Sequence, residues 1–316
     1  MIEISNLVKY YGDKRAVSGI SFKVNQGEIL GFLGPNGAGK STTLNIISGY
    51  LSATSGTVTI NGYDILEQPE LAKKNIGYLP ELPPLFADMT VMEYLTYVSE
   101  LKQVPKTIRK KQISDIMKMV HIGNVSGRLI HNLSKGFRQR VGIAQALIGN
   151  PEVLILDEPT VGLDPNQVIE MRKLIMSLSK NHTIIFSSHI LSEVQAICDR
   201  IVIINHGKIV ADAPTLEMTA QIEGNAHYLL TLDAPFNSIQ MPLRAIPSVQ
   251  SVTLLSERDG LIQIEVVAEG NIDVRKSIFY TLAKANFPIL EFKSAAASLE
   301  DIFTSMTSPK SEGRTR

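Results

Sequence analysis

The sequence has 316 residues, of which 44% are hydrophobic and 20% are charged, an ordinary composition for a globular protein with a sizeable core. Its 31 basic and 31 acidic residues give a formal net charge of zero, which argues against nucleic acid as a partner because such proteins usually carry a basic excess. The longest apolar runs, such as "IVII" and "VLIL", fall far short of the ~18 residues that a membrane span requires, and the N-terminus lacks a signal-peptide layout, so we expect any membrane role to need a partner.

The first predicted site follows the short apolar strand "EILGFLG", which leads into the glycine-rich loop "GPNGAGKST". The residues after the loop, "STTLNIISGY", have apolar side chains at helical spacing. A strand, a loop and a helix in this order match the phosphate-loop motif G-x-x-x-x-G-K-[ST] and its structural context. The alternative is a chance glycine turn before a helix, but it does not explain why the strand before the loop and the helix after it both match the context of the motif.

The chemistry expected of this loop is phosphate binding. Glycines let backbone N–H groups converge on phosphate oxygens, and the helix N-terminus adds a favourable dipole. We expect Lys40 to reach the β and γ phosphates and the Ser41 hydroxyl to ligate Mg²⁺. The predicted nucleotide-binding residues of the loop are Gly34, Pro35, Asn36, Gly37, Ala38, Gly39, Lys40, Ser41 and Thr42.

A lone carboxylate marks the next predicted strand. In "IGYLPELPPLF", Glu81 follows the strand and is itself followed by Pro83 and Pro84. Polar residues at strand ends are where sites are built on a parallel sheet. Residues 90–126 then have a helical pattern with a basic, solvated face.

Two acids end the predicted strand "EVLILDEP", a continuous apolar run that is typical of a buried parallel strand. Because Mg²⁺ binds carboxylate and phosphate oxygens, we expect Asp157 to hold the metal through water. Glu158 is then the candidate to orient or deprotonate an attacking water. The alternative, two solvated acids that cap a helix, fits less well with the apolar run before them and the proline after them.

Further apolar strands, "HTIIFSSH" and "DRIVIIN", alternate with helices, which predicts an α/β fold with a parallel sheet. Beyond about residue 215 the order becomes β-α-β-β-α-β, which predicts a small α+β domain of ferredoxin-like type, and "SLEDIFTSM" predicts a closing amphipathic helix. We therefore predict an ATP-binding domain at 1–218, an accessory domain at 219–308 and a disordered tail at 309–316.

A segment between the two nucleotide motifs, "NLSKGFRQRVGIAQAL", resembles the signature of ATP-binding subunits of ABC transporters, which usually reads LSGGQ. Ser134 and Gly136 match the signature, whereas Lys135 and Phe137 depart from its commonest form. The continuation "QRVGIAQAL" matches the family's signature helix.

Three more motifs occur in the family's order, so that the resemblance covers roughly residues 2–215. "VGLDP" resembles the D-loop with Asp164 as its acid, and "SSH" supplies the switch histidine, His189. Tyr11 in "YYG" lies where the family keeps an aromatic that stacks on adenine. Each motif alone has an ordinary structural explanation, but their order and separations are specific.

The resemblance implies a P-loop NTPase fold with a RecA-like parallel sheet, an antiparallel β subdomain and a helical signature subdomain. It also implies ATP hydrolysis with Mg²⁺ between two head-to-tail subunits, each ATP lying between the phosphate loop of one and Ser134 and Gly136 of the other. His189 would contact the γ-phosphate and help to position the water. The motion would drive transmembrane permease subunits at the cytoplasmic face of the cell membrane, and the second ATP-binding subunit can be identical or different.

Glu81 stands where the family usually has a glutamine that reaches Mg²⁺ and the attacking water. The favoured interpretation is that Glu81 makes the same oxygen contact and changes little. The sharper hypothesis is that it makes closure more steeply dependent on the metal. Because Glu81 would lie near Asp157 and Glu158, like charges should raise one pKa when the metal is absent.

The C-terminal ending "ASLEDIFTSMT", together with "YLPE" and "SKGFRQR", resembles exporter ATPases, most closely the gliding-motility and multidrug-like subfamily. The accessory domain would steady the dimer or regulate it, and we favour the first. The alternative function is a non-transport, soluble ABC ATPase, although such proteins carry two ATPase domains, a long coiled coil or no accessory domain. A P-loop kinase or GTPase fits neither the signature nor "SSH".

Overall fold

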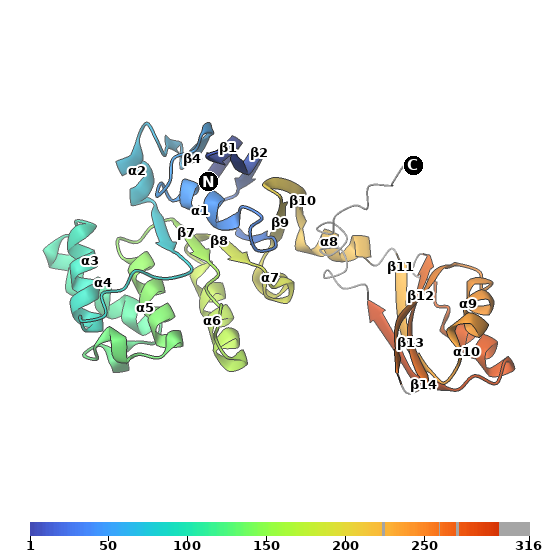
Figure 1. Cartoon of the computed structure of the whole chain (residues 1–316). Coiled ribbons are helices and arrows are strands. Elements are labelled where there is room, and N and C mark those ends of the chain that lie inside the picture. Colours follow the sequence, from blue (N-terminus) through green and yellow to red (C-terminus); the bar gives the residue numbers. More distant parts are fainter. Residues whose placement is uncertain (223–224, 259, 270–271, 297–316) are drawn as a thin grey trace. The chain divides into compact units, whose positions relative to one another are not determined.

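The computed structural model describes residues 1–222, 225–258, 260–269 and 272–296 (Figure 1). The chain divides into two compact units, Met1–Thr215 and Leu216–Arg316. Thr215 is tied to the first unit because its N–H donates to Asp199 O at 2.9 Å and its hydroxyl donates to Cys198 O at 2.7 Å. The predicted closing helix "SLEDIFTSM" and the predicted tail at 309–316 lie outside the described residues.

A six-stranded sheet in the order β10-β9-β3-β8-β7-β6 forms the centre of the first unit. All its neighbouring strands pair in parallel except β10 (Lys208–Pro214), which is antiparallel to β9. The parallel strands are β3 (Ile29–Leu33), β6 (Ile76–Leu79), β7 (Val153–Asp157), β8 (Thr183–Ser188) and β9 (Arg200–Asn205). Every residue of β3, β7 and β8 is buried, which confirms the parallel sheet that the apolar runs predicted.

An antiparallel sheet in the order β2-β1-β4-β5 packs against the same core. Leu7 of this sheet, Leu44 of α1 (Lys40–Ile47) and Phe32 of β3 are fully buried in one hydrophobic cluster. The phosphate loop and α1 are therefore anchored to both sheets. The antiparallel strands are β1 (Ile2–Tyr11), β2 (Lys14–Val24), β4 (Ser55–Ile60) and β5 (Tyr63–Asp64).

Helices surround the parallel sheet, and α3, α4 and α5 gather at one side of it (Figure 1). α3 begins at a capping box, in which the Thr90 side chain accepts from the Glu93 N–H and the Glu93 side chain accepts from the Thr90 N–H. None of the helices in the described ranges combines the length and apolar character of a membrane-spanning segment. The bounds of these helices are α2 (Pro69–Lys74), α3 (Val91–Leu101), α4 (Lys106–Met119), η1 (Gly123–Val125), η2 (Ile130–Asn132), α5 (Lys135–Leu147), α6 (Pro165–Leu178) and α7 (Leu191–Ile197). The next helix, α8 (Thr215–Ile222), begins at the last residue of the first unit.

The second unit has a four-stranded antiparallel sheet in the order β12-β13-β11-β14. Tyr228 and Ile264, on neighbouring strands, are buried with Ile239 and Ile278 of the two helices. The chain order β-α-β-β-α-β and this strand order confirm the predicted ferredoxin-like fold. Its elements are β11 (Asn225–Leu232), α9 (Phe236–Arg244), β12 (Val249–Arg258), β13 (Leu261–Glu269), α10 (Arg275–Lys284) and β14 (Ile289–Ala296).

Candidate functional site

The loop of residues 34–39 leaves the carboxyl end of β3 and ends where α1 begins. Gly39 has a φ of +110°, and a Cβ at this position would lie 2.7 Å from Ala16 O. A Cβ at Gly34 would lie 2.4 Å from Ile204 O. Both positions therefore require glycine, because any side chain would push the loop away from β9 and β2.

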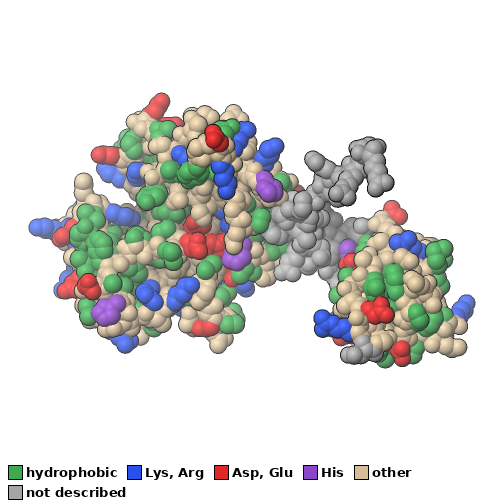
Figure 2. Space-filling view, in the orientation of Figure 1, with side chains coloured by type: hydrophobic (Ala, Val, Ile, Leu, Met, Phe, Trp, Pro, Cys, Tyr) green, Lys and Arg blue, Asp and Glu red, His purple; other side chains and the backbone are tan. Residues whose placement is uncertain are grey.

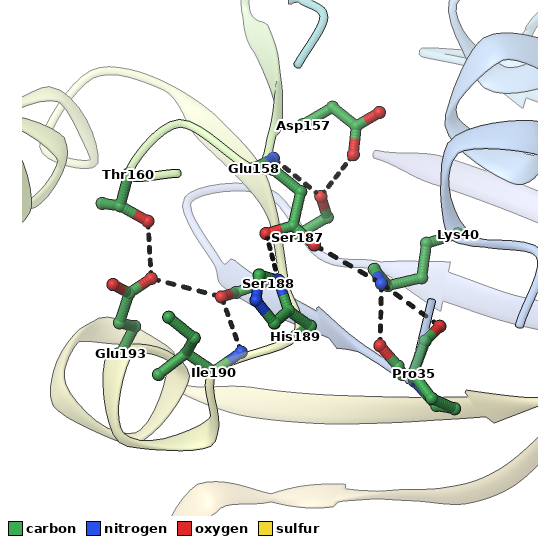
Figure 3. Close-up of polar contacts among 11 residues, drawn as sticks. Pro35, Lys40, Asp157, Glu158, Thr160, Ser187, Ser188, His189, Ile190 and Glu193 are labelled. Carbon is green, nitrogen blue, oxygen red and sulfur yellow. Dashed lines mark hydrogen bonds and ion pairs between the residues drawn. The ribbon is translucent and has the colours of Figure 1, made fainter. Parts of the chain in front are cut away.

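Lys40 is the buried cation of the site. Its Nζ donates to Gly34 O at 2.7 Å and to Pro35 O at 3.4 Å, and it lies 3.4 Å from Glu158 Oε1 (Figure 3). The side chains of Lys40 and Glu158 are each 6% exposed. Because a buried charge is costly unless it is paired, each of these groups makes the burial of the other tolerable. The ammonium group is thereby fixed at the loop, where a phosphate oxygen can compete for it.

The carboxyl ends of β7 and β8 bring polar groups to one edge of the sheet. The Ser187 hydroxyl donates to Asp157 Oδ1 at 2.6 Å and accepts from the Glu158 N–H at 3.0 Å (Figure 3). Glu158 has a φ of +49°, a left-handed conformation that costs a non-glycine residue about 1–2 kcal/mol. Such conformations persist where neighbouring contacts fix them, and Ser187 supplies one of these contacts.

His189 follows β8 directly and contacts the second oxygen of Glu158. His189 Nδ1 lies 2.9 Å from Glu158 Oε2, while Lys40 lies against Oε1 (Figure 3). The His189 side chain is 40% exposed, whereas that of Glu158 is 6% exposed. Glu158 is thus oriented from both sides, and His189 connects it to the surface.

Asp157 is an unusual carboxyl because it is buried at the edge of the sheet. Burial raises its pKa above the ordinary value, and the charges of Glu158 and Glu81 raise it further. Hydrogen bonds from Ser187 and Ser41 act in the opposite direction. The sequence predicted that like charges would raise one pKa, and here they do so, although burial is the larger cause.

A hollow of about 700 Å³ brings most of the predicted nucleotide-binding residues together. In Figure 2, acidic side chains lie beside a histidine in the middle of the first unit. Gly34 and Pro35 contribute the carbonyls that hold Lys40, and Ala38 is a buried residue of the loop. The predicted residues that line the hollow are Tyr11, Asn36, Gly37, Gly39, Lys40, Ser41, Thr42, Glu81, Glu158 and His189.

The predicted signature residues line a different hollow, of about 580 Å³, between α5 and α6. Ser134 caps α5, and its Oγ accepts from the Phe137 N–H at 3.4 Å. Asp164 caps α6, and its Oδ1 accepts from the Gln167 N–H at 3.0 Å. A Cβ at Gly136 would lie 2.5 Å from Gln167 Oε1, so the starts of the two helices are packed closely. Within one chain, the predicted site is therefore split into two parts.

Lys135, which departs from the common signature, is exposed on the first turn of α5. A Cβ built at Gly162 would lie 2.1 Å from Lys135 Nζ, so the ammonium group lies against the backbone of this D-loop glycine. Gly162 has a φ of +69°, a conformation that favours glycine. The unusual lysine thus connects the signature to the D-loop of the same chain.

Three predicted metal ligands, Ser41, Glu81 and Asp157, border a further hollow of about 640 Å³. Among the described residues, no group of three or more His, Cys, Asp or Glu could hold a metal ion by itself. Mg²⁺ commonly takes one or two carboxylates and completes its shell with water and phosphate oxygens. The hard oxygen donors present therefore fit Mg²⁺ that binds together with a phosphorylated ligand.

Several residues of the site were not singled out from the sequence. Ser187, Thr160 and Glu193 form hydrogen bonds around Glu158 and His189 (Figure 3). Lys14 and Arg15 line the hollow next to Tyr11. The sequence pattern could have predicted Ser187, because polar residues at the end of a buried strand indicate a site. The pattern for the basic pair after "YYG" was weaker.

Comparison with known proteins gives a consistent result. The family model described as "ABC transporter" matches residues 17–161. The chain is 31% identical over 308 residues to the linearmycin resistance ATP-binding protein LnrL of Bacillus subtilis, covering 97% of this chain and 98% of LnrL. It is 40% identical over 216 residues to the bacitracin transport ATP-binding protein BcrA of Bacillus licheniformis, covering 68% of this chain and 70% of BcrA. The dimeric structure of MJ0796, a bacterial ABC transporter cassette, is similar to this chain with a TM-score of 0.63 and 26% sequence identity. The match covers 68% of this chain and 99% of the MJ0796 chain.

Proposed function

This chain belongs to the ABC transporter ATP-binding family and is an ATPase that energises a transporter, and we propose that its two hollows are the two halves of composite ATP sites. The observation that carries the proposal is the separation of the predicted residues. Lys40, Glu158 and His189 meet in one hollow, whereas Ser134 and Gly136 line another. Two subunits placed head to tail would complete both sites.

The hollow at the phosphate loop supplies the groups that bind the nucleotide. Tyr11 is 49% exposed at its edge, which suits an aromatic that stacks on adenine. Lys40 and the N-terminus of α1 face the position that phosphates would take. These residues bind and orient ATP before any chemistry takes place.

Ser41, Asp157 and Glu81 are the residues that we propose to hold Mg²⁺. They present a hydroxyl and two carboxylates around one hollow. When bound, Mg²⁺ neutralises charge that develops on the phosphate oxygens. Because the pKa of Asp157 is raised, occupancy of this metal site should be lost at a higher pH than at an ordinary aspartate as the pH falls.

Glu158 and His189 are the proposed residues for activation of the attacking water. A phosphate oxygen that approaches Lys40 competes with Glu158 Oε1 for the ammonium group, 3.4 Å away. This competition leaves Glu158 oriented by His189 and able to accept a proton from water. Binding of the nucleotide would thus prepare the base.

The signature hollow supplies the second half of the proposed site. Ser134 and Lys135 are exposed at the N-terminus of α5, where an anion is favoured by the helix dipole. The chain's similarity to MJ0796, whose cassette is dimeric, supports a head-to-tail pair. Ser134 and Gly136 would then contact the γ-phosphate bound by the other subunit, and the D-loop with Asp164 would lie at the junction.

The residues beyond Glu81 form the proposed contact with a transmembrane permease. Leu82 is 81% exposed, Phe86 47% and Leu101 63%, and Figure 2 shows hydrophobic side chains gathered over α3. An apolar surface of this kind marks a protein interface. We place it at the cytoplasmic face of the cell membrane, with Pro83 and Pro84 as a stiff connection to Glu81.

The transporter is proposed to be an exporter. LnrL is a linearmycin resistance protein and BcrA a bacitracin transport protein, and the likeness to LnrL extends over both units. These names support an antibiotic-like cargo and the multidrug-like group that the C-terminal sequence resembles. The second unit is proposed to steady the pair of ATPase subunits.

Purification from membranes tests this proposal. The tagged full-length chain should co-purify with a membrane protein that contains several apolar spans, which mass spectrometry would identify, and the complex should hydrolyse ATP. Leu82→Glu should weaken recovery of the partner, whereas Val210→Glu, an exposed change on β10, should leave it intact. A chain that hydrolyses ATP but purifies alone would instead favour a soluble ABC ATPase.

A further inference from the structure

Glu193 is a buried carboxylate that does not line the phosphate-loop hollow. It lies in the first turn of α7, four residues after His189, and is 3% exposed. The Thr160 hydroxyl donates to Glu193 Oε2 at 2.5 Å, and the Ser188 hydroxyl donates to the same oxygen at 3.2 Å (Figure 3). The Ser188 Oγ also accepts from the Ile190 N–H at 3.0 Å.

The burial of this charge is expensive. Among the ion pairs of the described residues, none involves Glu193, so two neutral hydroxyls carry the compensation. An apolar side chain of similar size would fill the position without a desolvation cost. The presence of a carboxylate therefore points to a task that needs an acceptor of two hydrogen bonds at this position.

The two donors belong to the two segments that carry the proposed catalytic groups. Thr160 opens the segment after Glu158, and its carbonyl accepts from the Leu163 N–H at 3.2 Å as the chain turns towards Asp164. Ser188 is the last residue of β8 and directly precedes His189. One oxygen of Glu193 thus ties together the segments on both sides of the 2.9 Å contact between His189 and Glu158.

We infer that Glu193 is a positioning residue for hydrolysis. Through Ser188 and Thr160 it holds the His189 segment against the segment of residues 158–164, so that His189 Nδ1 stays on Glu158. The inference rests on the proposed roles of His189 and Glu158. Because Glu193 lies outside the group of residues that line the phosphate-loop hollow, it should affect kcat and leave the binding of ATP unchanged.

Steady-state ATP hydrolysis by the full-length chain with its co-purified partners tests this role. Glu193→Ala should lower kcat about ten- to hundredfold, with little change in the KM for ATP, since hydrogen bonds to a charged acceptor are lost. Glu193→Gln should recover most of the rate because its amide oxygen accepts from both hydroxyls. Gln195→Ala, an exposed change on the same helix, is the matched control and should match the wild type.

A double-mutant cycle with His189→Ala separates positioning from general stability. If Glu193 acts through His189, the variant with both changes should be no slower than His189→Ala alone. Thr160→Val, which conserves shape and removes the 2.5 Å hydrogen bond, should show a smaller loss of kcat that also disappears in the His189→Ala background. This second variant keeps the test available should Glu193→Ala fail to fold.

Three outcomes would overturn the inference. In the first, the variant with both Glu193→Ala and His189→Ala has a kcat lowered by the product of the two single losses. In the second, the KM for ATP of Glu193→Ala rises as its kcat falls. In the third, the kcat of Glu193→Gln is as low as that of Glu193→Ala. Each leaves the proposed function intact. Failure of the proposed function gives a different result, namely a wild-type kcat for His189→Ala alone. That result would contradict the proposed role of His189 and would remove the basis of the inference as well.

Discussion

The two hollows of the first unit differ in how their charges are held. At the phosphate loop, Glu158 contacts both Lys40 and His189, and the side chains of Glu158 and Lys40 are almost fully buried. At the start of α5, Ser134 and Lys135 are exposed, and the first helical turn contains no acidic residue. A cation at a helix N-terminus opposes the helix dipole, so this end of α5 lacks the electrostatic compensation present at the phosphate loop.

This difference indicates which half can act alone. The phosphate loop has its cation, its proposed base and its proposed metal ligands in one chain, so a single subunit should bind ATP. The signature presents a helix N-terminus, an exposed hydroxyl and the uncompensated cation of Lys135 beside the D-loop glycine, Gly162. Its function should therefore depend on an anion brought by a second subunit, and changes in the two halves should have different consequences.

The largest expected effect is the loss of ATP turnover when Glu158, the proposed base at the phosphate loop, is replaced. Glu158→Gln should lower ATP turnover about 10²- to 10⁴-fold, because an amide cannot accept the proton from water. ATP binding should persist, since Lys40 keeps its contacts with Gly34 and Pro35. Turnover is measured on the complex with its partners, and binding by calorimetry.

Glu152→Gln is the matched control for this change. Glu152 is an exposed acid just before β7, at the opposite end of the strand from Asp157. The Glu152→Gln variant should hydrolyse ATP at the wild-type rate. Wild-type turnover in Glu158→Gln would remove Glu158 from the role of base and weaken the contrast between the two halves.

The smallest expected effect concerns Glu81 and the pH dependence of the metal site. Since the pKa of Asp157 is raised, Mg²⁺-dependent turnover at limiting Mg²⁺ should fall as pH drops, and it should begin to fall at a higher pH than for an ordinary aspartate. Glu81→Gln removes one cause of the raised pKa, so the acid limb should move to lower pH. Because burial is the larger cause, we expect the half-saturating Mg²⁺ concentration at neutral pH to change only about twofold.

Glu67→Gln, an exposed change before α2, is the control for Glu81→Gln. Identical Mg²⁺ and pH curves for the wild type and Glu81→Gln would eliminate any steeper metal dependence through Glu81. A change of tenfold or more would contradict the interpretation that Glu81 and a glutamine make equivalent oxygen contacts with the metal.

The parts of the site that local sequence could predict were those with short-range signals. The phosphate loop is contiguous, and the acids after "VLIL" stand out against a buried apolar run, so residue patterns alone predicted Lys40, Asp157 and Glu158 as site residues. The fold class followed from the same runs, which structure and relatives confirm. The β-α-β-β-α-β order of the second unit was visible from alternation and helical spacing.

The contacts that sequence reasoning missed join residues far apart along the chain. Ser187 and Asp157 are 30 positions apart, and Thr160 and Glu193 are 33 apart. No periodicity encodes such a pairing, because it depends on which strand ends the sheet order brings together. The sequence predicted the effect of like charges on the pKa of Asp157 but not the larger effect of burial. Burial at the sheet edge is a property of the folded core, which local sequence does not encode.

The central claim is that each ATP site is made from the phosphate loop of one subunit and the signature of another. Lys40→Ala should lose ATP affinity in calorimetry, whereas Ser134→Arg should bind ATP normally as a single subunit but fail to hydrolyse it. Neither variant alone should support turnover. Lys208→Ala, an exposed change on β10, serves as the control for the first variant.

Co-expression of Lys40→Ala and Ser134→Arg with two different tags, followed by tandem purification of mixed pairs, tests the claim most directly. One composite site of each mixed pair then combines an intact phosphate loop with an intact signature, while the other carries both lesions. The account predicts ATP turnover well above that of either variant alone. Mixed pairs that stay as inactive as the single variants would mean that each site is built within one chain, and would contradict the account.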